Sequence, residues 1–193
     1  MAWGPLLGGA PWVLSWVVVE TYIYVSGGFV LEFSKPWRDP AGYKRGRLLE
    51  ARYEAELALR FLEEGLYRNA AGKAFGAWRA LLAALAVDYV EVLAERFRGV
   101  RGTREGRRVR LADFIAAFMP TGYMLAVASV LEKAAGVGLV GLTNVALNLH
   151  ELQYNGLDRA GVFGRYPSLE FVEEDVKRLA AAVLELAARL GAG

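Results

Sequence analysis

The longest apolar stretch of the chain runs from Tyr67 to Phe97 and predicts a helix of about eight turns. Between Ala74 and Val87 its only charged residue is Arg79, and apolar residues cover nearly the whole circumference. A helix that is apolar all round belongs in the middle of a bundle or in a membrane. Small residues fill its first half, so neighbouring helices can approach closely. We therefore expect the rest of the fold to be arranged around this helix.

Apolar residues three and four positions apart predict further helices on both sides of this stretch. The first follows Asp39 and Pro40, which suit the cap and the first position of a helix, and Gly65 suits its end. These predicted helices cover residues 41–64, 111–119, 121–135, 139–154 and 168–190. Short connections make successive helices antiparallel. The expected fold class is therefore all-α, an up-and-down antiparallel helical bundle of four long helices plus a short one.

The first 34 residues do not continue the helical pattern, and Glu20 is the only charged residue before Glu32. A secretory signal is disfavoured because no Lys or Arg precedes the apolar run. Residues 12–31 have the length of a membrane helix, but Glu20 would lie in mid-span and the composition is typical of strands. For residues 1–34 we therefore favour a β-hairpin or a loosely attached apolar extension over a membrane anchor, and we expect the helical bundle domain at residues 35–193.

Composition excludes several kinds of chemistry. The chain has 193 residues, which suggests one domain with a sizeable core, and its net charge of +2 does not by itself indicate nucleic acid. The absence of cysteine excludes disulfides, thiolate metal sites and cysteine nucleophiles. One histidine without HExxH or Glu-x-x-His spacing argues against a metal site, and no cofactor motif is present. The scarcity of Cys and Gln suits a heat-adapted organism.

Polar residues gather on the predicted helix 139–154 and at the start of the central helix. The candidate ligand-binding residues are Asn69, Lys73, Asn144, Asn148 and Glu151. His150 and Tyr154, four positions apart on an adjacent edge, are the candidate catalytic residues. If the two helices pack together, these residues form either a nucleotide or RNA phosphate site, with His150 as the acid–base group, or a buried network that fixes helix register. We favour the network because no second His, acidic pair or phosphate loop accompanies them.

The segment from Arg96 to Arg110 contains seven arginines, three glycines and one glutamate, and we expect a loop. The candidate nucleic-acid contacts are Arg98, Arg101, Arg104, Arg107, Arg108 and Arg110. Such a loop can follow a phosphate backbone, although it lacks interleaved aromatic residues, and exposed arginines also serve solubility alone.

The blocks KPWRDP, FLEEGLYRNAAGKAFGAWRALLAALA, AFMPT and LTNVALNLHELQYNG resemble the archaeal PaREP family over about Lys35 to Leu190. That family is similar to the HEPN superfamily of helical nucleotide-binding and RNase domains. The resemblance implies a homodimeric helical bundle in an archaeal cytoplasm, and it implies that residues 1–34 are a misassigned start or a loosely packed hairpin. Active HEPN ribonucleases resemble one another in an Arg that precedes a His by a few residues. His150 matches that His but no such Arg precedes it, which argues against RNA cleavage.

The function we expect is that of a non-catalytic, dimeric binding or interaction module. The alternative is a weak, metal-independent ribonuclease, or a domain that binds nucleotide or RNA, using His150 and the Arg96–Arg110 segment. A membrane partner through residues 12–31 is disfavoured.

Overall fold

A computed structural model describes residues 22–25, 29–32, 34–103, 106–162 and 164–191. The chain divides into two compact units, the first ending at Ser34 and the second beginning at Lys35. In the first unit, β1 (Tyr22–Val25) pairs with β2 (Phe29–Glu32) in an antiparallel register. This confirms the predicted β-hairpin. Of the alternative membrane segment, residues 12–21 and 26–28 lie outside the described residues.

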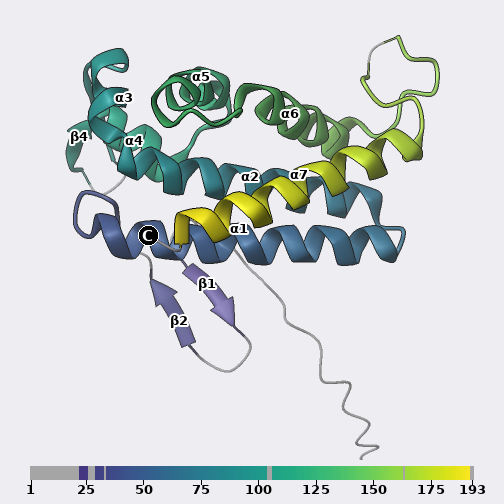
Figure 1. Cartoon of the computed structure of the whole chain (residues 1–193), viewed down its shortest axis with the longest axis horizontal. Helices are drawn as coiled ribbons and strands as arrows, with labels where there is room; N and C mark the ends of the chain where they lie inside the picture. The colour runs from purple at the N-terminus through teal and green to yellow at the C-terminus, as the bar shows by residue number, and fades with distance from the viewer. Residues whose placement is uncertain (1–21, 26–28, 33, 104–105, 163, 192–193) are drawn as a thin grey trace, which may run out of the picture. The chain divides into compact units, whose positions relative to one another are not determined.

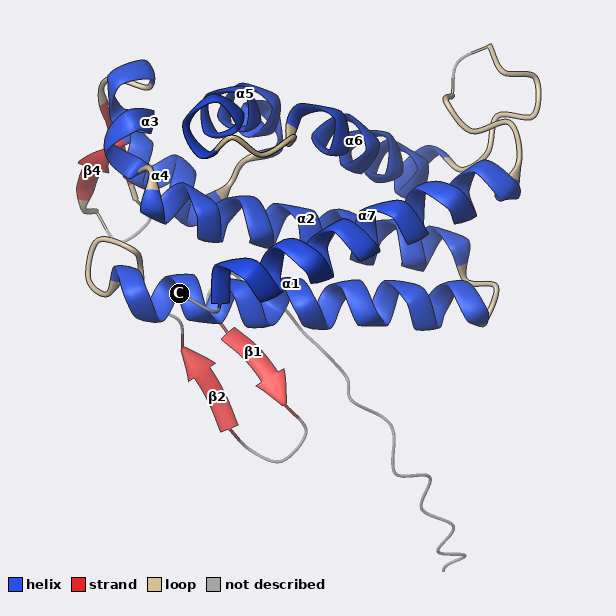
Figure 2. Ribbon diagram, viewed as in Figure 1, coloured by secondary structure: helices blue, strands red, loops and turns tan. Residues whose placement is uncertain are grey.

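The second unit is built from helices packed around one central helix (Figures 1 and 2). Its α-helices are α1 (Pro40–Glu63), α2 (Tyr67–Asp88), α3 (Val90–Arg96), α4 (Leu111–Phe118), α5 (Met124–Ala135), α6 (Val140–Asn155) and α7 (Leu169–Gly191). A 3-10 turn, Thr121–Tyr123, precedes α5. In Figure 1, α7 crosses in front of α2 and α1 runs along one side of it. The all-α bundle is confirmed, and the described part contains more helices than the four long ones and one short one expected.

Helix α2 is the centre of the core. Trp78 on α2 is completely buried, and its indole Nε1 donates a hydrogen bond of 3.0 Å to Thr143 Oγ1 on α6. By length and composition α2 is apolar enough to cross a membrane, and so are α4 and the segment 121–135 taken together, although they are bent by 114°. However, 72% of the 18-residue apolar stretch of α2 is buried inside the protein, as expected for a core helix.

The predicted helix 67–97 is broken at Tyr89, whose φ of −118° and ψ of 25° are not helical. At the break, the Asp88 carboxylate forms an ion pair of 2.7 Å with Lys44 of α1. The chain then changes direction, so that α3 contacts α4 and α5 and buries Leu93 and Phe97 against the core. One straight helix of this length would carry these two apolar side chains past the end of the bundle.

The segment expected to be a loop contains an antiparallel β-hairpin. Its strands are β3 (Val100–Gly102) and β4 (Arg108–Arg110), and Arg101 pairs with Val109. Val109 is buried between two exposed arginines, which is the alternation of a strand with one buried face. Alternation over three residues is too short to distinguish from an irregular loop in the sequence.

We expect Trp78→Ala to lower the free energy of unfolding by about 3–5 kcal/mol, because a buried ring leaves a cavity that its neighbours cannot close. Trp78→Phe keeps most of the ring volume but removes the hydrogen bond to Thr143, so it should cost only about 1 kcal/mol. Urea unfolding of both variants measures these values. A loss below 1 kcal/mol for Trp78→Ala would show that α2 is not the anchor of the core.

Candidate functional site

The His150 side chain lies on α6 within a small group of aromatic rings. Its ring stacks on Phe75 of α2, with centroids 4.0 Å apart and planes inclined by 20°, and the Tyr154 ring meets it edge-on at 5.2 Å. The Nδ1 atom is buried and has no hydrogen-bond partner within the described part of the chain. Burial and, secondarily, the charge of Arg79 lower the pKa of His150. The imidazole is therefore neutral near pH 7, and within the described part of the chain no hydrogen bond to Nδ1 orients it as a general base.

Arg79 is the cation that reading the sequence missed. Its guanidinium lies over the Phe75 ring, 5.7 Å from the centroid, and close enough to His150 to lower the pKa of that residue. Among the described residues it forms no ion pair, although it is partly buried. The signal was present, because Arg79 is the only charge in the apolar half of the central helix. Its proximity to His150 depends on which face of α2 packs against α6, and the sequence does not specify that face.

Lys73 does not meet the polar residues of α6. Its ammonium instead forms an ion pair of 2.9 Å with Glu54 on α1. Gly76 permits this approach, because a Cβ there would lie only 3.2 Å from Glu54 Oε2. Burial raises the pKa of Glu54, and the positive charge of Lys73 opposes that increase. The pair joins α1 to α2 and has a structural role.

The remaining candidates on α2 and α6 are not assembled into one site. Asn69 is exposed, and Asn144 donates a hydrogen bond to the Val140 carbonyl of its own helix. Asn148 is half-buried, and Glu151 lies 3.6 Å from Arg165. Among the described residues, no hydrogen bond or ion pair joins these four side chains to one another.

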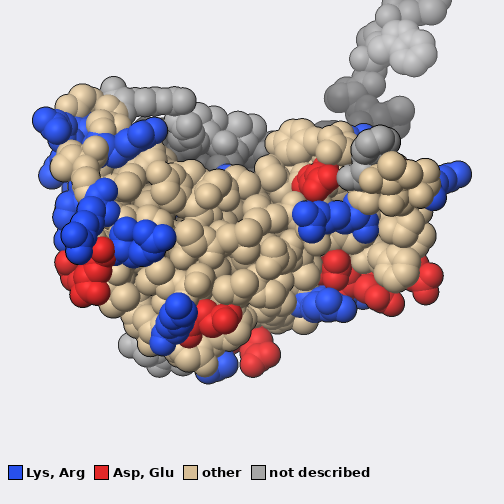
Figure 3. All heavy atoms as spheres, turned by 90° about the horizontal axis from the view of Figure 1, so that it is seen from above, with Lys and Arg blue, Asp and Glu red and all other residues tan. Residues whose placement is uncertain are grey.

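Basic side chains gather at the end of the second unit that is formed by α3, β3, β4 and α4 (Figure 3). We call this region, with its exposed arginines and the adjacent rings of α4, the basic end surface. The exposed arginines are Arg96, Arg98, Arg101, Arg107 and Arg108. Within the described ranges none of these five forms an ion pair with a carboxylate, and Arg104 lies outside those ranges.

Arg110 differs from the other arginines because it anchors the hairpin. Its guanidinium donates hydrogen bonds to Asp113 at 2.8 and 3.1 Å and to Glu91 at 2.8 and 2.9 Å. The carboxylates of Asp113 and Glu91 raise the pKa of Arg110, and Arg110 in turn lowers the pKa of Glu91. Arg110 therefore ties β4 to α3 and α4 and is not available to a ligand.

Aromatic rings from α4 complete the basic end surface. Phe114 and Phe118 are half-buried, with ring centroids 4.8 Å apart. The Arg101 guanidinium lies 5.8 Å from the Phe114 centroid, and Lys35 Nζ lies 4.5 Å from that of Phe118. These rings follow the arginine segment in the sequence, one helical turn apart. Only the packing of the hairpin on α4 brings them beside the arginines.

The described residues contain no group of three or more His, Asp or Glu side chains that could hold a metal ion. The family model described as the archaeal PaREP1/PaREP8 family matches residues 46–179, well over half of the chain. That range includes α2, α6 and the basic end surface apart from Lys35. No curated protein and no solved structure matches the chain.

The lowered pKa of His150 predicts a pH dependence of stability. A depressed folded-state pKa means that the unfolded chain binds the proton more readily, so this contribution is complete above about pH 6.5 and is lost as the pH falls through the folded-state pKa. We therefore expect the wild type to lose stability relative to His150→Gln as the pH falls from 7.5 to 5, because glutamine does not titrate. Denaturant unfolding of both proteins at the two pH values measures it. The same difference at both values would mean that the imidazole titrates as it does in water.

Proposed function

We propose that this chain, which belongs to the archaeal PaREP1/PaREP8 family, is a non-catalytic module that binds single-stranded RNA on the basic end surface. The observation that supports this proposal is the placement of exposed arginines, which form no ion pair within the described ranges, beside the Phe114–Phe118 ring pair.

Arginines that have no carboxylate partner within the described ranges provide the sequence-independent part of the affinity for RNA. Neutralising a phosphate releases a condensed counterion, and this gain is largest for cations that do not already have a carboxylate partner. Arg107 and Arg108 are exposed at the start of β4 and fulfil that condition among the described residues. The buried Val109 and the hydrogen-bonded Arg110 hold them in position, so the backbone of the hairpin is already ordered before RNA binds.

The aromatic pair favours a single strand over a duplex. Bases that are not paired can stack on protein rings and on guanidinium planes, whereas the bases of a helix are already stacked. Phe114 and Phe118 are partly accessible, and Arg101 adds a planar cation beside them. A surface of this composition has little means of distinguishing one base from another, so we expect weak sequence preference.

The absence of catalysis in this proposal is supported by the surroundings of His150. Its ring packs against Phe75 and Tyr154, its pKa is lowered, and no motif in the sequence supplies a second acid–base group. Arg79 lies nearby but packs on Phe75, and no contact in the described ranges connects either residue with the basic end surface.

We expect the double variant Arg107→Gln/Arg108→Gln to bind a fluorescein-labelled oligouridine more weakly, with a logarithmic salt slope reduced by about 1.4, since each contact to a single strand contributes about 0.7. Fluorescence anisotropy at several salt concentrations measures the slope. Arg178→Gln, which removes an exposed charge from α7, is the matched control and should bind as the wild type does. Equal slopes for the double variant and the control would contradict the proposal.

Phe114→Leu should weaken binding of the same RNA by about 1–3 kcal/mol, because an apolar side chain remains but the stacking surface is lost. The loss should persist at high salt, where the arginine contribution is screened. Gel analysis of the recovered RNA tests for cleavage. Cleavage by the wild type that disappears in His150→Ala, at unchanged stability, would refute the non-catalytic assignment.

A further inference from the structure

The two ends of the second unit carry opposite charge. The basic end surface lies at one end, and the turn between α1 and α2 lies at the other end together with the start of α7 (Figure 1). Exposed glutamates gather there, and within the described ranges none of them forms an ion pair: Glu63, Glu64, Glu170 and Glu174. We call these four residues, with the exposed side chains of Leu66, Leu169 and Phe171, the acidic end surface.

Most basic side chains near the acidic end surface already have partners within the protein. Four of them are bonded in this way: Arg68 to the carbonyls at the end of α6, Arg165 to Glu151, Lys177 to Glu173 and Arg178 to Asp175. Arg60 and Arg159 are exposed and form no ion pair among the described residues. These two cations reduce the negative charge of the four glutamates but do not cancel it.

Exposed apolar side chains also lie at these two ends. Leu169 is 41% exposed and Phe171 is 51% exposed at the start of α7, and Val100 of β3 is 55% exposed within the basic end surface. Large apolar side chains that are exposed among charges are typical of a surface that binds another protein. A partner for either surface should therefore offer apolar contact together with the opposite charge.

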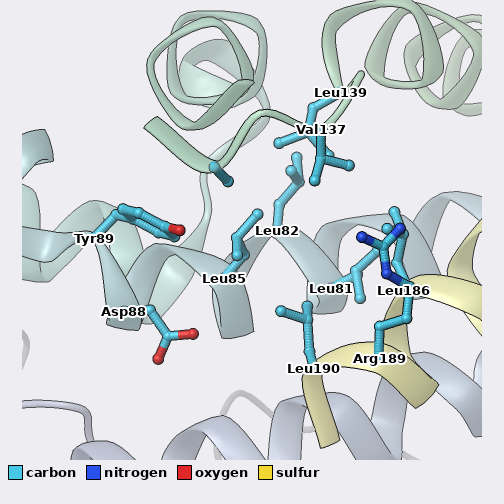
Figure 4. Close-up of a pocket in the computed structure, with 11 residues that line it drawn as sticks. Leu81, Leu82, Leu85, Asp88, Tyr89, Val137, Leu139, Leu186, Arg189 and Leu190 are labelled. Carbon is cyan, nitrogen blue, oxygen red and sulfur yellow. The ribbon is translucent and has the colours of Figure 1, made fainter. Parts of the chain in front are cut away.

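A groove between the end of α2 and the last turns of α7 differs from both ends (Figure 4). The Asp88 carboxylate pairs with Lys44 at 2.7 Å, and Arg189 has Glu185 as its partner at 3.9 Å. The leucines that α2 contributes to it are buried in the core: Leu81, Leu82 and Leu85. This groove therefore offers a protein partner less than either end surface does.

We propose that the acidic end surface of one copy of this chain binds the basic end surface of a second copy. Each copy carries both surfaces, so the contact is head-to-tail and can repeat along a row of copies. The exposed arginines of one copy pair with the four glutamates of the next, and the rings of α4 cover Leu169 and Phe171. The contact does not rest on RNA binding, but it uses the same arginines, so RNA and a second copy exclude each other.

Sedimentation equilibrium of the full chain without RNA tests this contact. The weight-average mass should rise with protein concentration at about 50 mM salt and should fall at about 500 mM salt, because exposed charge pairs are screened. A mass that does not change with concentration at the lower salt would overturn the proposal. Oligouridine should also lower the mass, and an oligouridine that binds but leaves the mass unchanged would overturn it too.

A charge variant tests the acidic end surface and leaves the basic end surface intact. Glu170→Gln/Glu174→Gln should weaken the association about tenfold at low salt, and its affinity for RNA should stay that of the wild type. Glu56→Gln/Glu185→Gln removes two exposed carboxylates that lie outside both end surfaces and is the matched control. Equal association by the variant and its control would overturn the proposal.

A mixture of two variants distinguishes a head-to-tail contact from a symmetric dimer. Arg107→Gln/Arg108→Gln lacks part of the basic end surface, and Glu170→Gln/Glu174→Gln lacks part of the acidic one. Each variant alone should associate weakly, whereas their equimolar mixture should form a complex of two chains, because one intact surface of each kind remains. A mixture that associates no better than the separate variants would overturn the proposal.

Discussion

Helix α2 has almost no polar face, and keeping it out of water determines where the other helices of the second unit lie. Burial of its apolar surface is the largest favourable contribution, and α1, α6 and α7 each cover a different side of it. Polar contacts then orient these surrounding helices on α2. Trp78 is hydrogen-bonded to Thr143 of α6, and the Arg68 guanidinium donates to the carbonyls of Gln153 and Tyr154, which have no helical partner at the end of α6.

The same constraint leaves few places for charge inside the bundle. A buried charge requires a partner, and Lys73 meets this requirement by pairing with Glu54 across the α1–α2 interface. Arg47 does so on the neighbouring turn of α1, where it donates to Glu50 and to the Tyr43 hydroxyl. Arg79 is an exception and rests on the face of Phe75. Most charged groups in the interior are therefore committed to structure, and surfaces available to ligands lie at the periphery.

The basic end surface depends on the break in the central helix. Three-residue strands are too short to be stable alone, so β3 and β4 require an external support. The turn at Tyr89 places Glu91 of α3 where it can bind Arg110, and Asp113 of α4 binds the same guanidinium. This arrangement holds one arginine and leaves its neighbours exposed. The chain turns at Tyr89 because Leu93 and Phe97 have to be buried. This turn therefore determines indirectly where Arg107 and Arg108 can reach a ligand.

Hydrophobic periodicity by itself determined the helical class, the central position of residues 67–88 and most helix ends, because these depend on residues close together in the chain. The Asp39 cap is an example, since its carboxylate accepts from the Gly42 amide three residues away. Only the tertiary structure decided which faces of the helices meet. It paired Lys73 with Glu54 instead of the α6 residues, brought Arg79 and Phe75 to His150, and placed Phe114 beside Arg101. Each of these contacts depends on the rotation of one element against another, which is set by packing volume across the whole core and leaves no local pattern in the sequence.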